Sequence, residues 1–200
     1  MGVDGHIPLQ TDIGAFETEL ALDLPDHLFQ ENDGQVVLEA EQFTWQRGRG
    51  QQAWLTQSTL TGYMDTGYVT ALPDVGLRVD DLQSSDVPEL EYTIYFTTTG
   101  VYTTWLRGYA LDGAGDSVYV SLAGATVLTP TTYSLTGFMP RTWAWTNQTS
   151  DGTPLRLTIA EPGLYTLRLG IREDGLRLDR LLLTTDSGYT PTGNGPAESE

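Results

Sequence analysis

The stretch VVLEAEQF at residues 36–43 interleaves apolar side chains with acids and predicts a β-strand. Because side chains alternate along a strand, Glu39 and Glu41 share one face with Val37 and Phe43. Two carboxylates this close are unfavourable unless a positive group neutralises them. The rest of the sequence therefore has to supply a positive group beside this strand.

The composition favours an all-β protein with an acidic surface. Two hundred residues suffice for one domain, and 22 glycines, 10 prolines and short apolar runs are typical of β-sheet proteins. The formal net charge is −17, and all ten basic residues are arginines. Such a surface repels phosphate backbones and anionic lipids, so we expect no nucleic acid and no membrane among the partners.

Several classes of site are excluded by residue types that the sequence lacks. There is no cysteine, which removes disulfides, thiolate nucleophiles and zinc–thiolate centres. The two histidines, His6 and His27, precede the first clear strand, so the main domain holds no Ser-His-Asp triad. The start MGVDGHIP has no signal-peptide pattern, and we expect the signal of a secreted parent protein to lie upstream.

From residue 34 onward, turn motifs such as TTTG at 97–100 and EDG at 173–175 separate short strand-like runs. Short strands at a spacing of roughly ten residues predict an all-β fold, a jelly-roll β-sandwich of two antiparallel sheets. The predicted strands are 35–43, 67–71, 75–79, 89–97, 101–109, 117–122, 126–129, 141–146, 153–160, 163–171 and 176–184.

The two ends of the sequence differ from this regular part. Residues 1–33 lack a sustained alternation, and 187–200 have the Gly/Pro/polar composition of a flexible linker, which places the sandwich at 34–186. The piece TDIGAFETE at 11–19 resembles the closing motif of right-handed parallel β-helix domains. That resemblance implies that residues 1–33 hold the tail of an upstream domain and a linker. The alternative is a loop that packs on the sandwich.

The last predicted strand, LRLDRLLL, also interrupts an apolar run with an acid, Asp179. The first and last strands of a jelly roll commonly lie side by side, which would bring Asp179 close to Glu39 and Glu41. Three carboxylates without a lysine suit Ca²⁺, which accepts six to eight oxygen ligands. The alternative is that the two glutamates face water and that Asp179 pairs with Arg177 or Arg180.

Four segments together resemble a known family of domains. They are the E-A-E strand, GVYTTWLRG at 100–108, RTWAWTNQ at 141–148 and EPGLYTLRLGIREDGLRLDRLLLT at 161–184. They are similar to carbohydrate-binding modules of the family 6 and family 35 type, and closer still to the C-terminal domains of family 115 glycoside hydrolases. The resemblance covers about residues 34–190 and implies a structural calcium bound by Glu39, Glu41 and Asp179.

Aromatic residues suggest where a sugar would bind, because flat rings stack on the C–H faces of sugars. Trp143 and Trp145 are two residues apart and share a face of an extended segment. They form an exposed platform if Thr142 and Ala144 point inward, whereas the alternative buries both indoles in the core. The resemblance implies that this W-x-W segment contributes to a ligand site at one edge of the sandwich.

The turn REDG at 172–175 lies between the last two strands, and the resemblance places it beside the same cleft. Its side chains are free to contact a sugar if they point outward, and the alternative is a turn held by local pairing. The predicted ligand-binding residues are Trp54, Tyr63, Arg107, Trp143, Trp145, Arg172, Glu173 and Asp174.

These patterns lead to one functional hypothesis and one alternative. The hypothesis is a non-catalytic, monomeric module that binds a polysaccharide or oligosaccharide. It would be attached to a catalytic or β-helix domain of a larger secreted or cell-surface bacterial protein. The alternative is a structural or adhesion module that contacts neighbouring domains without binding sugar. We do not expect an enzyme, because the adjacent carboxylates Glu173 and Asp174 point apart at a turn and seldom flank one bond.

Overall fold

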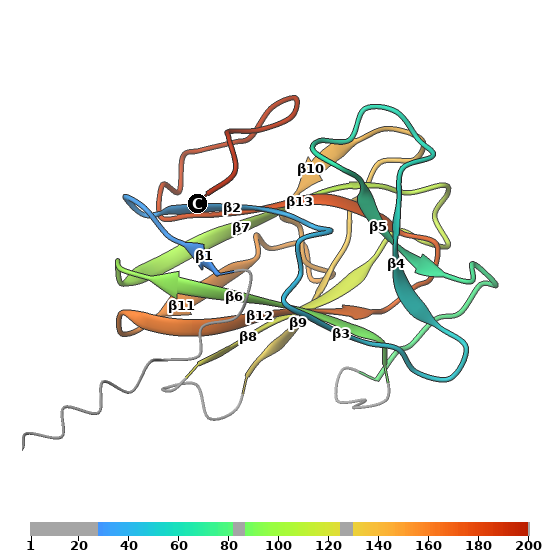
Figure 1. The fold of residues 1–200 in the computed structure, drawn as a ribbon, viewed down its shortest axis with the longest axis horizontal. Helices are drawn as coiled ribbons and strands as arrows, with labels where there is room; N and C mark the ends of the chain where they lie inside the picture. Colours follow the sequence, from blue (N-terminus) through green and yellow to red (C-terminus); the bar gives the residue numbers. More distant parts are fainter. Residues whose placement is uncertain (1–27, 82–86, 125–129, 200) are drawn as a thin grey trace, which may run out of the picture.

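The computed structural model describes residues 28–81, 87–124 and 130–199, and these form a sandwich of two β-sheets (Figure 1). The six-stranded sheet has the strand order β1-β6-β12-β8-β9, and β3 also pairs with β6. Its strands are β1 (Phe29–Gln30), β3 (Trp45–Arg47), β6 (Glu89–Phe96), β8 (Val118–Gly124), β9 (Thr132–Leu135) and β12 (Gly163–Ile171).

The seven-stranded sheet has the order β10-β7-β13-β5-β4, with β11 paired to β7 and β2 paired to β13. Its strands are β2 (Gln35–Glu39), β4 (Ala53–Gln57), β5 (Tyr68–Leu72), β7 (Gly100–Tyr109), β10 (Ala144–Thr146), β11 (Arg156–Ile159) and β13 (Arg177–Thr184). Every strand pair is antiparallel except β1 with β6. The predicted all-β sandwich is therefore confirmed.

The core lies between the two sheets and follows the alternation of each strand. In β6 the buried side chains are Leu90, Tyr92, Ile94 and Phe96, whereas the residues between them are more exposed. Trp54 of β4 is 2% exposed and belongs to this core. The prediction that Trp54 is a ligand-binding residue is therefore wrong, because its indole is buried in the core.

The first and last long strands are neighbours, as the sequence predicted. In the register, Glu39 of β2 lies opposite Arg180 of β13. The β13–β7 register shifts between Leu178 and Arg180, so Asp179 occupies a bulge. The carbonyl of Asp179 accepts a hydrogen bond from the N–H of Ala40 at 2.8 Å. This closure brings the two acidic segments of the chain together.

The remaining strand predictions have mixed outcomes. Residues 75–79 are a loop with a single bridge, because the N–H groups of Val75 and Gly76 bind the carboxylate of Asp174 instead of a strand. The predicted strand 126–129, the two histidines and the segment 11–19 lie outside the described residues. Strands β1, β3, β4 and β9 were not predicted.

Residues 187–199 fold back over β13 and β2 and end beside Val37 (Figure 1). We call this segment the C-terminal strap. Its Pro191 is buried, and Ser199 donates its N–H to the carbonyl of Val37 at 2.9 Å. The strap is ordered against the sheet and does not match the interpretation as a flexible linker.

The described part of the chain contains no helix with the length and hydropathy needed to cross a membrane.

Candidate functional site

The outer face of the seven-stranded sheet carries a row of polar and aromatic side chains across four strands. The register places Trp145 opposite Arg107, Arg107 opposite Arg180, and Arg180 opposite Glu39. Leu181, the next residue of β13, belongs to the core, so this row points away from the core. Three of its members are nevertheless buried, because the C-terminal strap covers them.

Arg180 provides a positive charge for Glu39. Its Nε lies 2.8 Å from Glu39 Oε1, an ion pair without hydrogen-bond geometry. Its Nη1 donates to the carbonyls of Asn194 and Pro196 in the strap, both at 2.6 Å. The Arg180 guanidinium therefore joins the first strand, the last strand and the strap.

Arg107 provides the charge for Asp179. Its Nη1 donates to Asp179 Oδ2, and its Nη2 donates to the carbonyl of Gly62 at 3.0 Å. Two more bonds reach the strap, to the carbonyl of Gly193 at 3.1 Å and to Asn194 Oδ1 at 3.1 Å. Arg107 is 4% exposed, so it is not free to contact a ligand as the sequence predicted.

Two further carboxylate oxygens, one of Asp179 and one of Glu41, bind the backbone of the loop before β5. Asp179 Oδ1 accepts the N–H of Met64 at 2.8 Å, and Glu41 Oε1 accepts the N–H groups of Thr66 at 3.1 Å and Gly67 at 2.9 Å. Burial raises the pKa of the Glu41 carboxyl. Burial also raises the pKa of Glu39 to about 8, against the opposing effect of Arg180.

This donor set does not fit the calcium site that the resemblance implies. Both oxygens of Asp179 are engaged, by Met64 and Arg107, and Glu39 is paired with Arg180. Glu39 Oε2 and Glu41 Oε2 have no hydrogen-bond partner, but two oxygens beside two guanidinium groups do not make a calcium cage. Among the described residues, no group of three or more His, Cys, Asp or Glu side chains is placed to hold a metal ion.

Trp145 is part of the covered region. Its indole N–H donates to the carbonyl of Gly193 at 3.1 Å, the same acceptor that Arg107 uses. A Cβ added at Gly195 would lie 2.6 Å from the indole ring, so only glycine lets the strap approach this closely. Trp145 shares the outer face with Trp143, as one of the two sequence alternatives predicted, but the strap covers it.

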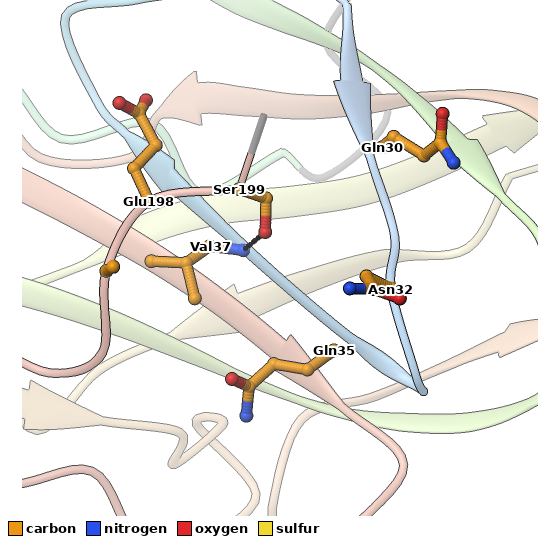
Figure 2. Close-up of a pocket in the computed structure, with 7 residues that line it drawn as sticks. Gln30, Asn32, Gln35, Val37, Glu198 and Ser199 are labelled. Carbon is orange, nitrogen blue, oxygen red and sulfur yellow. Dashed lines mark hydrogen bonds between the residues drawn. The ribbon is translucent and has the colours of Figure 1, made fainter.

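The end of the strap borders a polar cavity of about 670 Å³. Figure 2 shows the side chains of Gln30, Asn32 and Gln35 around it, together with the hydrogen bond of 3.0 Å from the N–H of Val37 to Ser199 Oγ. None of its lining residues is aromatic. The cavity therefore offers amide groups without a stacking surface.

Beyond the covered region, the same face carries a chain of aromatic rings that is only partly buried. The Trp143 ring centroid lies 5.4 Å from that of Tyr68 and 5.5 Å from that of Tyr109, and Tyr63 lies 5.6 Å from Tyr68. The Arg177 guanidinium lies 5.5 Å from the Tyr109 ring. We call Tyr63, Tyr109, Trp143 and Arg177 the aromatic platform; all four are half-buried.

Trp143 is fixed in place from the covered side. Its indole N–H donates to the carbonyl of Thr61 at 3.0 Å, and the Arg107 guanidinium lies 5.5 Å from its ring. Tyr109 and Arg177 were not among the predicted site residues. Tyr109 could have been found from the sequence, because it lies two residues after Arg107 on β7 and therefore shares its face. Arg177 could not, because its place beside Tyr109 depends on the pairing of β13 with β7.

The REDG turn is a structural connection. Glu173 and Asp174 are 4% and 1% exposed. Asp174 accepts the N–H of Val75 at 2.8 Å, and Glu173 accepts the hydroxyl of Ser117 at 2.6 Å. Arg172 also donates to the Ser117 hydroxyl, at 2.5 Å. The two carboxylates are therefore used inside the fold and do not project from the turn. Their main partners lie on other loops, so the local pairing of the sequence alternative accounts only for the contact of Arg172 with Glu173 at 3.5 Å.

Comparison with protein families matches residues 28–198 to the C-terminal domain of glycosyl hydrolase family 115. The chain belongs to this family. The resemblance drawn from the E-A-E and W-x-W segments is thereby confirmed. The family boundaries also include β1 and nearly the whole strap, which agrees with the packing of both segments on the sandwich.

One relative of this chain is a longer protein. "Uncharacterized protein P23" of Formosa agariphila is 25% identical over 205 residues, which cover 84% of this chain and 48% of the relative. The chain therefore spans about half the length of that relative.

Two solved structures share the fold. One is the GH26-CBM35 β-(1,4)-mannanase of Podospora anserina, with a TM-score of 0.52, 20% identity, and coverage of 80% of this chain and 29% of that chain. The other is the isomalto-dextranase of Arthrobacter globiformis T6 in complex with panose, with a TM-score of 0.51, 19% identity, and coverage of 75% and 23%. At these identities the likeness concerns the fold alone.

Proposed function

We propose that this domain is a non-catalytic carbohydrate-binding module whose ligand lies across the aromatic platform. The observation that carries the proposal is the group of half-buried rings of Tyr63, Trp143 and Tyr109 next to the Arg177 guanidinium. The ring of Tyr63 joins the other two through the buried ring of Tyr68. Ring faces stack on the C–H surfaces of sugars, and a guanidinium donates to their hydroxyls. The family of carbohydrate-binding folds to which the sandwich is similar supports this use of the platform.

The proposal includes no chemistry on the sugar. The pair of carboxylates considered for hydrolysis, Glu173 and Asp174, is buried and bonded to backbone and hydroxyl groups away from the platform. A general acid needs to reach the glycosidic oxygen, and neither group is accessible. The role is retention of a polymer near an attached domain.

We also propose that the domain is part of a larger protein that acts outside the cell, because that is where it would encounter a polysaccharide. The structural neighbours supply a parallel, since the matched part covers 29% of the mannanase chain and 23% of the dextranase chain. A tethered module raises the effective concentration of its partner domain at the polymer without needing high affinity of its own.

The test uses retention of the domain in native gels that contain soluble polysaccharides, after a glycan array has selected a ligand. Trp143→Ala is expected to weaken retention by at least about tenfold, because it removes the central ring of the platform. Trp45→Ala is the matched control. It removes an indole that is 46% exposed on the opposite sheet, and it is expected to leave retention unchanged.

Two results would overturn the proposal. Wild-type domain that is retained by no glycan would favour the structural or adhesion module. Equal losses in Trp45→Ala and Trp143→Ala would move the site away from the platform. Thermal unfolding of both variants verifies that each still folds.

A further inference from the structure

At the other end of β7 from Tyr109, a second cleft of about 400 Å³ opens on the outer face of the same sheet. Its walls are the turn between β6 and β7, the edge strand β11 and the residues at the start of the C-terminal strap. The side chains that matter here are those of Thr99, Val101, Thr103, Arg156, Thr185 and Ser187.

Arg156 is the charged residue of this cleft. It lies opposite Thr103 in the β11–β7 register, and its side chain is exposed. Six other arginines pair with carboxylates, namely Arg47, Arg78, Arg107, Arg168, Arg172 and Arg180. In the described part of the chain, no hydrogen bond or ion pair engages the Arg156 guanidinium. Although the sequence has 27 acids and 10 arginines, Arg156 has no acidic partner among the described residues.

The rest of the lining suits a sugar that carries a negative charge. Hydroxyl groups of Thr99, Thr103 and Ser187 make no side-chain hydrogen bonds within the described residues, so they are available to a ligand. Val101 is 51% exposed and offers apolar surface to the C–H face of a ring. Asp186, the acid beside this cleft in sequence, turns its Oδ1 to the N–H of Gly188 at 2.9 Å.

We propose that this cleft binds the anionic substituent of a sugar, a carboxylate or a sulfate ester, through the guanidinium of Arg156. Arginine presents a planar fork of donors that matches two oxygens of either group. The net charge of −17 disfavours anions over the protein as a whole, so such binding depends on the short-range contact with Arg156. The site lies apart from the aromatic platform and does not depend on it.

The test is an NMR titration with galacturonate, galactose 6-sulfate and galactose, which differ only at the substituent on carbon 5. The two charged sugars are expected to shift the amide signals of Thr99, Val101 and Arg156 in a saturable way, and galactose is not. Arg156→Gln is expected to weaken this binding by at least about tenfold. Arg141→Gln, which removes another exposed arginine, is the control of equal charge and is expected to bind as the wild type does.

Comparison of the two charged sugars shows which oxyanion the cleft prefers. The inference is overturned if neither of them shifts these signals, or if Arg156→Gln and Arg141→Gln bind equally well. Trp143→Ala separates the two sites, because it is expected to lose retention by polysaccharide while the shifts at Arg156 persist. A domain that fails on the glycan array can still pass this titration, so the two proposals fail independently.

Discussion

Two neighbouring regions on the outer face of one sheet differ in exposure: one is covered and the other is partly open. The row that contains Trp145, Arg107 and Arg180 is covered by the C-terminal strap, and its charges are neutralised inside the protein. The adjacent aromatic platform, with Trp143 and Tyr109, has the same strand alternation but stays half-open. What separates structural residues from available ones is therefore the cover supplied by the strap, and not the residue types in the strands.

The comparison also explains how buried charges are tolerated. Burying an unpaired charge costs far more than burying a pair whose hydrogen bonds are satisfied. Arg107 makes four such bonds, two of them to the strap. The strap therefore supplies hydrogen-bond acceptors that replace water around the buried guanidinium groups, and it also covers apolar side chains.

Removal of the strap is expected to have the largest effect. A chain that ends at Asp186, the boundary that composition suggested, uncovers Val37 and Leu182 and removes the acceptors of Arg107 and Arg180. We expect a loss of roughly 5 kcal/mol in the free energy of unfolding, from apolar exposure and from unsatisfied donors. Urea denaturation measures it. Unchanged stability would mean that the segment is a linker after all, and Thr192→Ala is the control within the strap.

Arg107→Met breaks the covered region from within. It leaves Asp179 buried without its partner, and we expect a loss of about 3–5 kcal/mol in the free energy of unfolding. Adding Asp179→Leu is expected to recover part of that loss, because the uncompensated charge is then gone. Arg168→Met, at a partly exposed pair, is expected to cost at most about 1 kcal/mol. Equal losses at Arg107 and Arg168 would contradict the difference between covered and exposed pairs.

The two tryptophans of the W-x-W segment sharpen the comparison. Trp145→Ala removes a ring held by the strap and is expected to cost about 2 kcal/mol of stability while sugar binding is unchanged. Trp143→Ala is expected to act mainly on sugar binding. Thermal unfolding and gel retention of both variants measure the two effects. A reversed pattern would show that the ligand lies under the strap.

Calcium is expected to have the smallest effect. Arg107 and Arg180 already neutralise Asp179 and Glu39, so the melting temperatures in calcium chloride and in a chelator should agree within about 1 °C. Differential scanning calorimetry measures this directly. A rise of several degrees with calcium would restore the metal site that the family resemblance implies.

The sequence predicted the sandwich because strand alternation and turn motifs are local signals. It also predicted the adjacency of Glu39 and Asp179, since that follows from the closure of the fold. The role of Arg107 could not be predicted, because it depends on a bulge in β13 and on carbonyl groups of a segment 86 residues away, at Gly193. A Gly/Pro-rich composition describes a chain that can be flexible, and does not reveal where its carbonyls find donors.

The loss of the REDG turn from the predicted site has a similar cause. Turn tips are usually accessible, but Asp174 and Glu173 here collect donors from other loops, including the N–H of Val75 and the hydroxyl of Ser117. Such long-range partners carry no pattern in the primary structure. Trp54 was misplaced for a different reason. The alternation of side chains along AWLTQ does not by itself show which face of the strand points inward, and Trp54 lies on the buried face.

The contact between the strap and β2 determines where segments that flank the domain would be joined to it. Gln30 of β1 and Ser199 line one cavity, so the two described ends of the chain lie at the same edge of the sandwich (Figures 1 and 2). Segments joined there would enter and leave the domain side by side. The domain would then project to one side of a larger protein, instead of lying in line between the preceding and the following domain.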